Sequence, residues 1–126
     1  MRKLLVILLL GICTIVQAQT TPDKKTSLFI TQLIYLVPGQ EKVFDQFEAV
    51  AIPIIAKYNG RLLVRTRLEQ KNIIEQTIET PYEIHLVEFE TEQDFNNFMK
   101  DEERKKFLHL KEQSIKSVVL VKGNRL

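Results

Sequence analysis

The chain is short of the residues that most often carry chemistry. Its 126 residues include a single cysteine, Cys13, no tryptophan and only two histidines. A lone cysteine forms no disulfide within its chain, and two histidines without an HxH or HExxH spacing predict no zinc site. Glycine-rich phosphate loops and GxSxG nucleophile motifs are also missing from the sequence. The sequence therefore predicts neither a metal nor a cofactor.

An excess of one charge sign is missing too, once the N-terminus is set apart. The whole chain has 18 Lys and Arg against 16 Asp and Glu. Arg2 and Lys3 account for this excess, so the rest of the chain is formally neutral. Without a basic stripe or interleaved aromatic residues, we expect no nucleic-acid partner.

The N-terminus has the pattern of a cleavable secretory signal. Arg2 and Lys3 precede an apolar run over residues 4–10, which resumes at 12–16, and Val16-Gln17-Ala18 offers compact residues at a cleavage site. The run is shorter than the roughly 20 residues that span a bilayer, although a retained N-terminal anchor is the alternative. We expect cleavage after Ala18, removal of Cys13, export to the periplasm or medium, and no stable membrane insertion afterwards.

The sequence divides into four parts on this basis. Residues 1–18 form the signal, and the polar, proline-containing residues 19–26 form a flexible lead. Residues 27–123 are expected to form one domain, and 124–126 a short tail. At this length only one domain is expected.

Hydrophobic periodicity predicts alternating strands and helices within that domain. Phe44, Phe47, Ala51 and Ile54 recur at helical steps, and Asn59-Gly60 ends that helix because glycine accepts a positive φ. The expected elements are strands at 27–37, 61–69, 83–90 and 117–122, with helices at 40–58 and from 91, the second interrupted near Lys100. Thr91 and Asp101 are expected to cap the two parts of that helix. Residues 70–82 either extend a hairpin or form a surface excursion.

The order β-α-β-β-α-β predicts an α+β, ferredoxin-like fold. In this fold a four-stranded antiparallel sheet carries two helices on one face. The first strand, however, is apolar on both sides, with Ile30 and Ile34 on one side and Phe29 and Leu33 on the other. Strands of this kind need cover on both faces. A second copy of the sheet is the most economical cover, so we expect a homodimer.

Several segments resemble the dimeric α/β-barrel superfamily of ferredoxin-like domains. They are Ile52–Arg65 (IPIIAKYNGRLLVR), Val87–Phe89, Asp101–Glu103 and Val118–Gly123. The pattern is most similar to a small bacterial family of unknown function, related to EthD-like and antibiotic-biosynthesis monooxygenase domains. The resemblance implies the fold and a dimer, but no particular chemistry. The haem-degrading branch fits poorly, because its site uses a tryptophan that this chain lacks.

The two histidines have different expected surroundings. His109 shares a helix face with charged residues and is expected to be solvated. His85 alternates with Val87 and Phe89 on a strand, so its side chain should point toward the margin of the core. A hydrogen-bonded structural role is the simpler expectation for His85, and ligand binding is the alternative.

Arg65 and Glu88 are the leading candidate ligand-binding pair. Strand alternation places both on the face away from the helices, where a dimer would bury them, with Tyr35 and Thr31 on the same side. The pair is either a structural ion pair or an anchor for a small acidic or carbonyl-containing molecule. The candidate ligand-binding residues are therefore Tyr35, Arg65, His85 and Glu88. Catalytic residues cannot be assigned from the sequence.

Other charged residues are expected to have structural roles. Arg67 should lie near the rim of the sheet. The run Asp101–Lys106 should form a solvated, capped turn.

Three functional classes remain compatible with the sequence. The first is an exported protein of unknown biochemical role that binds a small molecule in a barrel cavity. The second is a cofactor-independent oxygenase or isomerase. The third is a protein-interaction module without a ligand, which would have a filled barrel and an exposed apolar patch.

Overall fold

The computed structural model describes residues 27–126. The expected signal at 1–18 and lead at 19–26 lie outside the described residues, so cleavage and export remain predictions. Within residues 27–126, none of the helices has the length and apolar character needed to cross a membrane.

The predicted order of strands and helices is confirmed, with one difference in the second helix. The predicted interruption of that helix near Lys100 is confirmed, and a second interruption at Phe107, which was not predicted, divides it into three short segments. The elements are β1 (Leu28–Leu36), α1 (Glu41–Lys57), β2 (Gly60–Arg67), a 3-10 turn η1 (Gln70–Asn72), β3 (Glu83–Phe89), α2 (Glu92–Met99), α3 (Glu102–Lys106), α4 (Leu108–Ser114) and β4 (Ile115–Asn124). The last strand is longer than expected and includes Asn124, which pairs with Leu28.

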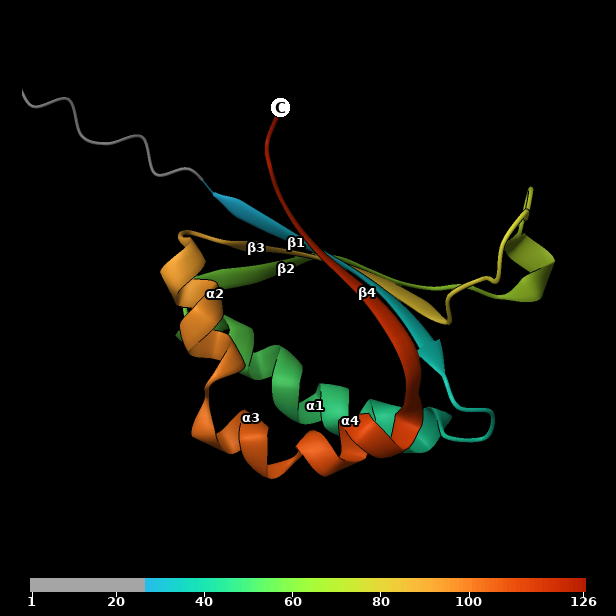
Figure 1. Ribbon diagram of the computed structural model, residues 1–126, viewed down its shortest axis with the longest axis horizontal. Coiled ribbons are helices and arrows are strands. Elements are labelled where there is room, and N and C mark those ends of the chain that lie inside the picture. The colour runs from blue at the N-terminus through green and yellow to red at the C-terminus, as the bar shows by residue number, and fades with distance from the viewer. Residues whose placement is uncertain (1–26) are drawn as a thin grey trace, which may run out of the picture.

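The four strands form one antiparallel sheet in the order β2-β3-β1-β4. All the helices lie on one side of this sheet, and the other side carries none (Figure 1). The predicted α+β, ferredoxin-like architecture is therefore confirmed. We call the two sides of the sheet the helix face and the outer face.

The core lies between the helix face and α1. Alternate residues of β1 and β3 point into it, as the period of two in a strand requires. The buried apolar side chains are Leu28, Ile30, Ile34, Phe44, Phe47, Ala51, Ile54, Ile55, Val87 and Phe89. Two aromatic side chains of α2, Phe95 and Phe98, pack on Phe89 with ring centroids 5.6 and 5.5 Å away. This packing fixes α2 against the sheet.

The junction between α1 and β2 uses Asn59 and Gly60 differently from the expectation. Asn59, not Gly60, has the positive φ, at 54°. Gly60 is needed for space, since a Cβ there would lie 2.6 Å from Cγ2 of Ile55 and 2.7 Å from Cε1 of Phe89. The absence of a side chain lets β2 begin directly against α1 and β3.

A β-bulge in β2 changes which residues face the helices. The register with β3 shifts between Leu62 and Val64. Leu62 pairs with Val87 on the helix face, whereas Val64 pairs with Leu86 on the outer face. An extra residue of this kind reverses the alternation of every later side chain in the strand. Arg65 therefore lies on the helix face, opposite to the expectation.

The two predicted helix caps are confirmed. The Thr91 hydroxyl accepts a hydrogen bond from the Asp94 amide at 3.1 Å, at the start of α2. The Asp101 carboxylate accepts one from the Arg104 amide at 2.8 Å, at the start of α3. These caps set the places where the second helical stretch restarts.

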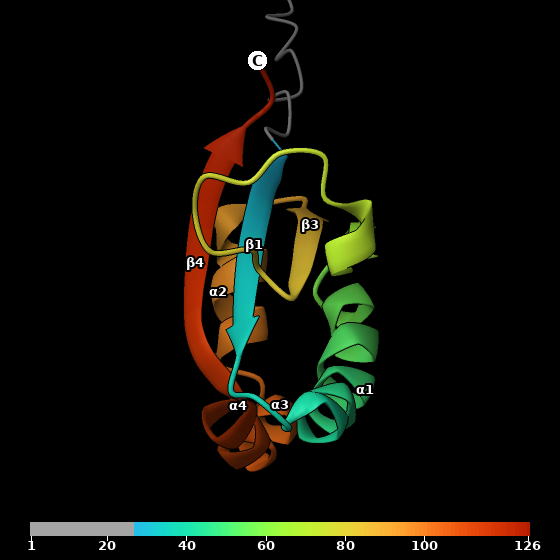
Figure 2. The same cartoon turned by 90° about the vertical axis from the view of Figure 1, so that its right-hand side faces the viewer.

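Residues 70–82 form the surface excursion, one of the two expected arrangements. Apart from η1 they have no regular secondary structure. The excursion extends from the ends of β2 and β3 beyond the sheet (Figures 1 and 2). It borders a hollow of about 710 Å³ at one end of the outer face, which Leu33, Tyr35 and Ile84 also line.

Candidate functional site

The four predicted ligand-binding residues lie on opposite faces of the sheet. Arg65 and His85 pair across β2 and β3 on the helix face. Tyr35 lines the outer hollow, and Glu88 lies on the outer face beside Arg61. The structure therefore does not bring the four together into one site.

The predicted Arg65–Glu88 pair is wrong. Nε of Arg65 donates to Oε1 of Glu83 at 2.5 Å, and Arg61 hydrogen-bonds Glu88 instead. The β-bulge is the physical reason, because it moves Arg65 to the other face while Glu88 stays where alternation placed it. Tyr35 and Glu88 both lie on the outer face, since Tyr35 lines the outer hollow with Leu33, and Glu88 pairs with Phe29, which alternates with Leu28 and Ile30 of the core.

Glu83 is the centre of a cluster of charged side chains on the helix face of the sheet. Its carboxylate is 1% exposed and receives hydrogen bonds from Arg65, Arg67 and the His85 ring, the last at 2.7 Å. Burial alone would raise the pKa of Glu83, but the bonds from His85, Arg65 and Arg67 outweigh it and lower that pKa to about 2. His85 is buried and hydrogen-bonded, as the structural expectation for it predicted.

A second carboxylate, Glu48 of α1, lies on the far side of His85. Its Oε2 is 4.0 Å from Nδ1 of His85, and the side chain is buried. Burial raises the pKa of Glu48, against the opposing effects of His85 and Arg65. The two carboxylates that flank His85 therefore have pKa values shifted in opposite directions, as in many sites that hold or transfer a proton.

Glu48 also forms part of the wall of a cavity between the sheet and the helices. We call this the sheet–helix cavity. Its volume is about 60 Å³, enough for a few water molecules or the head of a small molecule. Its wall consists of Ile30, Gln32, Phe47, Glu48, Ala51, Ile52, Ile55, Val87, Phe89, Phe95, Phe98, Met99, Arg104, Lys111 and Leu120. Leu120 of β4 is 45% exposed although it points to the helix face, so the cavity opens to solvent beside β4.

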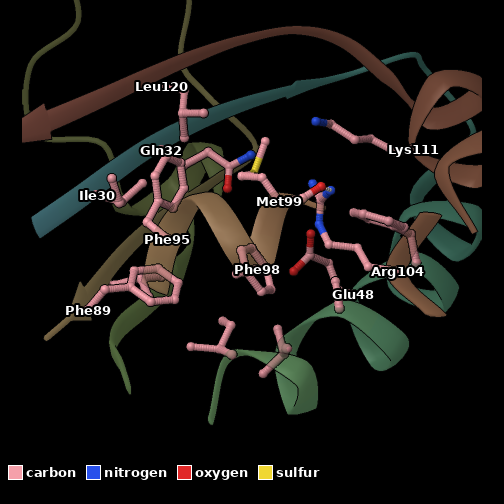
Figure 3. Close-up of a pocket in the computed structure, with 15 residues that line it drawn as sticks. Ile30, Gln32, Glu48, Phe89, Phe95, Phe98, Met99, Arg104, Lys111 and Leu120 are labelled. Atoms are coloured by element: carbon pink, nitrogen blue, oxygen red, sulfur yellow. Dashed lines mark hydrogen bonds between the residues drawn. The ribbon is translucent and has the colours of Figure 1, made fainter. Parts of the chain in front are cut away.

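The cavity has an apolar end and a charged end. Figure 3 shows Ile30, Phe89, Phe95 and Leu120 at one end, whereas Glu48, Arg104 and Lys111 gather at the other. An apolar pocket with a few convergent polar groups is the usual form of a small-molecule site.

Arg104 is a buried cation at the charged end. It is 6% exposed, and its guanidinium lies 5.1 Å from the ring centroid of Phe98 and 5.9 Å from that of Phe47. Nη1 donates to the Met99 carbonyl at 3.2 Å, whereas the buried Nε has no hydrogen-bond partner among the described residues. Burial lowers the pKa of Arg104. Buried donors without a partner are rare, which makes this Nε a candidate ligand contact.

The start of α3 holds Arg104 in position. Asp101, the cap of α3, accepts hydrogen bonds from the Tyr58 hydroxyl at 2.6 Å and from Lys57 at 3.1 Å, both at the end of α1. The Tyr58 bond, the Arg104 amide and Lys57 together lower the pKa of Asp101 to about 2. A persistent carboxylate at this point fastens α3 to α1 and directs Arg104 toward the cavity.

Within residues 27–126, no cluster of His, Cys, Asp or Glu has the composition to hold a metal ion. The charged end of the cavity instead offers an acid, Glu48, and two cations. It can bind an anion, or it can hold and release a proton at Glu48.

Comparison with known proteins identifies the family. Residues 33–124 match the family described as a domain of unknown function (DUF1330). The chain belongs to this family. The expected resemblance to a small bacterial family of unknown function is thereby confirmed. No curated protein matches the chain.

Solved structures similar to this DUF1330 chain share its fold at low sequence identity. The RPA0582 protein of unknown function from Rhodopseudomonas palustris has a TM-score of 0.67 at 13% identity, covering 82% of this chain and 85% of its own. A dimeric protein of unknown function with a ferredoxin-like fold from Bacteroides fragilis has 0.60 at 16%, covering 79% and 96%. A putative antibiotic biosynthesis monooxygenase from Bacteroides thetaiotaomicron has 0.61 at 12%, covering 80% and 90%. At these identities the likeness concerns the fold alone.

Sequence reasoning missed the charged residues of the cavity in this DUF1330 domain. The expectation that Asp101–Lys106 is a solvated turn is wrong for Asp101 and Arg104, which are buried, and right for the exposed Glu102, Glu103, Lys105 and Lys106. One signal for Glu48 was available, since it lies one helical turn from both Phe44 and Ala51 in the apolar stripe of α1. For Lys111 we find no comparable signal.

Proposed function

We propose that this protein is an exported, homodimeric binding protein for a small molecule, and that the ligand enters the sheet–helix cavity. The observation that carries the proposal is the combination of aromatic residues at one end of the cavity with Glu48, Arg104 and Lys111 at the other. In this proposal the ligand lies on the helix face, rather than inside the barrel between two outer faces. The outer hollow is a less suitable ligand site, because it is open to solvent in one protomer and the proposed dimer would cover Leu33, Tyr35 and Ile84 in its wall.

The apolar outer face supports the dimer. Leu33, Ile84 and Leu86 lie on that face, and Val119 and Val121 of β4 are 45% and 51% exposed on it. The similar protein from Bacteroides fragilis is dimeric with the same type of fold. A second copy would remove this apolar surface from water, at about 25 cal/mol per Å².

Export is proposed from the sequence of residues 1–18, which has the charged start, apolar run and small cleavage-site residues of a secretory signal. The mature chain would begin at Gln19, and Cys13 would be absent from it.

Native mass spectrometry of protein purified from its own host tests all three parts at once. The mass of the chain reports whether it begins at Gln19, the mass of the complex reports the dimer, and any excess mass reports a retained ligand. An intact Met1 start, a monomer or a protein that never carries a ligand would contradict the corresponding part.

A cavity-filling variant links the retained ligand to the cavity. Ala51 is buried in the cavity wall, so Ala51→Leu places three more carbon atoms in the cavity and should abolish the excess mass while the dimer persists. Ala56→Leu, on an exposed position of the same helix, is the matched control and should retain the ligand. Retention by Ala51→Leu would show that the ligand binds elsewhere.

Catalysis in the same cavity is the second candidate function. It is favoured by Glu48, whose pKa burial raises and whose neighbour His85 connects it to the charge cluster around Glu83. A carboxyl group of this kind suits proton abstraction in an isomerase or a cofactor-independent oxygenase. Chemical change of the bound molecule on incubation with wild type, but not with Glu48→Gln, would establish this function.

A further inference from the structure

We propose that the charged end of the sheet–helix cavity is a carboxylate-binding site, and that the ligand is a small carboxylic acid with an apolar, preferably aromatic, body. This inference rests on the proposed function, because it names the chemical class of the molecule that the cavity accepts. Three features of the cavity support it: the cations Arg104 and Lys111, the acid Glu48, and the aromatic residues of the apolar end.

Arg104 supplies the first contact. A guanidinium binds a carboxylate through two parallel N–H donors, and Nε with a terminal nitrogen forms one such pair. In this protein Nη1 is occupied by the Met99 carbonyl, whereas the buried Nε has no partner among the described residues. A buried donor left in this state costs free energy that a carboxylate oxygen would recover. Nε is therefore the donor of Arg104, a residue of the cavity wall, that lacks a partner for a ligand to supply.

Lys111 of α4 supplies the second contact from the other side of the charged end (Figure 3). Burial and the charge of Arg104 lower the pKa of the Lys111 amine. Two cations held close together in a partly dry cavity repel each other, and an anion between them relieves that repulsion. No ion pair of Lys111 with a carboxylate is formed among residues 27–126.

Glu48 is the one acid in the cavity wall. If it were ionised, its negative charge would repel a carboxylate ligand, so its protonation state matters for binding. Burial and the negative charge of Glu83 favour its neutral form. His85, Arg65 and Arg104 oppose this effect from β3, β2 and α3. A bound carboxylate adds negative charge and favours the neutral form further, in which Glu48 donates a hydrogen bond. Binding should therefore raise the pKa of Glu48 further.

The apolar end selects the rest of the molecule. Phe95 and Phe98 of α2 stand against Phe89 of β3, and Leu120 lies at the opening. The enclosed space is about 60 Å³, so the acid group and the first atoms of the body fit inside while the remainder extends past Leu120. A flat or branched body fits this opening best.

Paired probes test the carboxylate directly. Phenylacetate and isobutyrate, each with its neutral amide, are titrated into the mature protein and followed by ¹H–¹⁵N NMR. Each acid should bind about tenfold or more tightly than its amide, with shifts at the Arg104 Nε–H and at Phe98. Arg104→Met and Lys111→Met should each remove that preference, whereas the exposed Lys106→Met should keep it.

The outcomes separate this inference from the proposed function. If acids and amides perturb the cavity equally, the carboxylate inference is overturned and small-molecule binding stands. If neither perturbs the cavity, and wild type and Ala51→Leu carry the same mass from the host, both fall. Arg104 is buried and packs on Phe98, so Arg104→Met could fail to fold. Lys111 is only half-buried and makes no such contact with Phe98, so Lys111→Met tests the same site in a variant that should fold.

Discussion

Glu83 shows how strongly one buried carboxylate can depend on its donors. Three side chains from β2 and β3 hold it ionised, although it is almost completely excluded from water. Removing the negative charge would leave Arg65 and Arg67 with only the half-exposed Asp45, whose Oδ1 lies 3.8 Å from Nη2 of Arg65 and 2.8 Å from Nη2 of Arg67. The cluster therefore stabilises the fold only while Glu83 is charged.

Glu83→Gln should lower the free energy of unfolding by about 3 kcal/mol at pH 7. The pKa of Glu83 is lowered from 4.5 to about 2, so this stabilisation is present above pH 4.5 and is lost as the pH falls toward 2. Urea unfolding of wild type and variant at several pH values measures it. The exposed Glu69→Gln is the control. An equal difference between wild type and Glu83→Gln at pH 7 and pH 2.5 would contradict the account.

Alternation predicted the faces of β1 and β3 correctly, and His85 with them, because these strands are regular over Leu28–Ile34 and Glu83–Phe89. It failed at Arg65, since a bulge leaves no unambiguous mark in Leu62-Leu63-Val64. All three residues are apolar and fit either face. The candidate pair built on Arg65 and Glu88 failed for that reason alone.

At the scale of elements, the junction of α1 with β2 depends on the missing side chain of Gly60. A Cβ there would also lie 2.9 Å from the Ile55 carbonyl oxygen, a backbone atom that cannot rotate away. Gly60→Ala should therefore cost about 1–3 kcal/mol, measured by urea unfolding. Gly123→Ala, with nothing within 4 Å of the added carbon, is the matched control and should cost far less. Similar values for both would contradict the close approach described here.

Element order and caps were predictable because they depend on neighbours in the sequence. Thr91 and Asp101 precede their helices at the spacing that capping requires, and both caps form. The burial of Arg104 was not predictable in this way. It depends on Asp101 meeting Tyr58, a residue 43 positions away, which fastens α3 against α1.

At the scale of the whole molecule, the proposed dimer depends on the outer face. Leu33 pairs with Ile84 and Val119 near the middle of that face. Leu33→Asp should weaken association by about a hundredfold or more, because it places an unpaired charge in a buried interface. Analytical ultracentrifugation measures this, with Ala56→Asp on the exposed side of α1 as control. A wild-type protein that stays monomeric at micromolar concentration would remove the basis for the dimer.

The dimer and the ligand site use opposite faces of the sheet in this account. A dimer would cover Leu33, Tyr35 and Ile84, whereas the sheet–helix cavity stays open beside Leu120 in each protomer. Each protomer would then bind its own ligand, and dissociation by Leu33→Asp would leave binding intact.

A crystal structure of the protein purified with its ligand from its own host tests the central claim most directly. The account predicts ligand density between the sheet and the helices, with its polar group near Arg104 and Lys111 and its body against Phe95 and Phe98. Density between the two outer faces beside Tyr35, or ordered water alone in the cavity of a ligand-bearing protein, would contradict it.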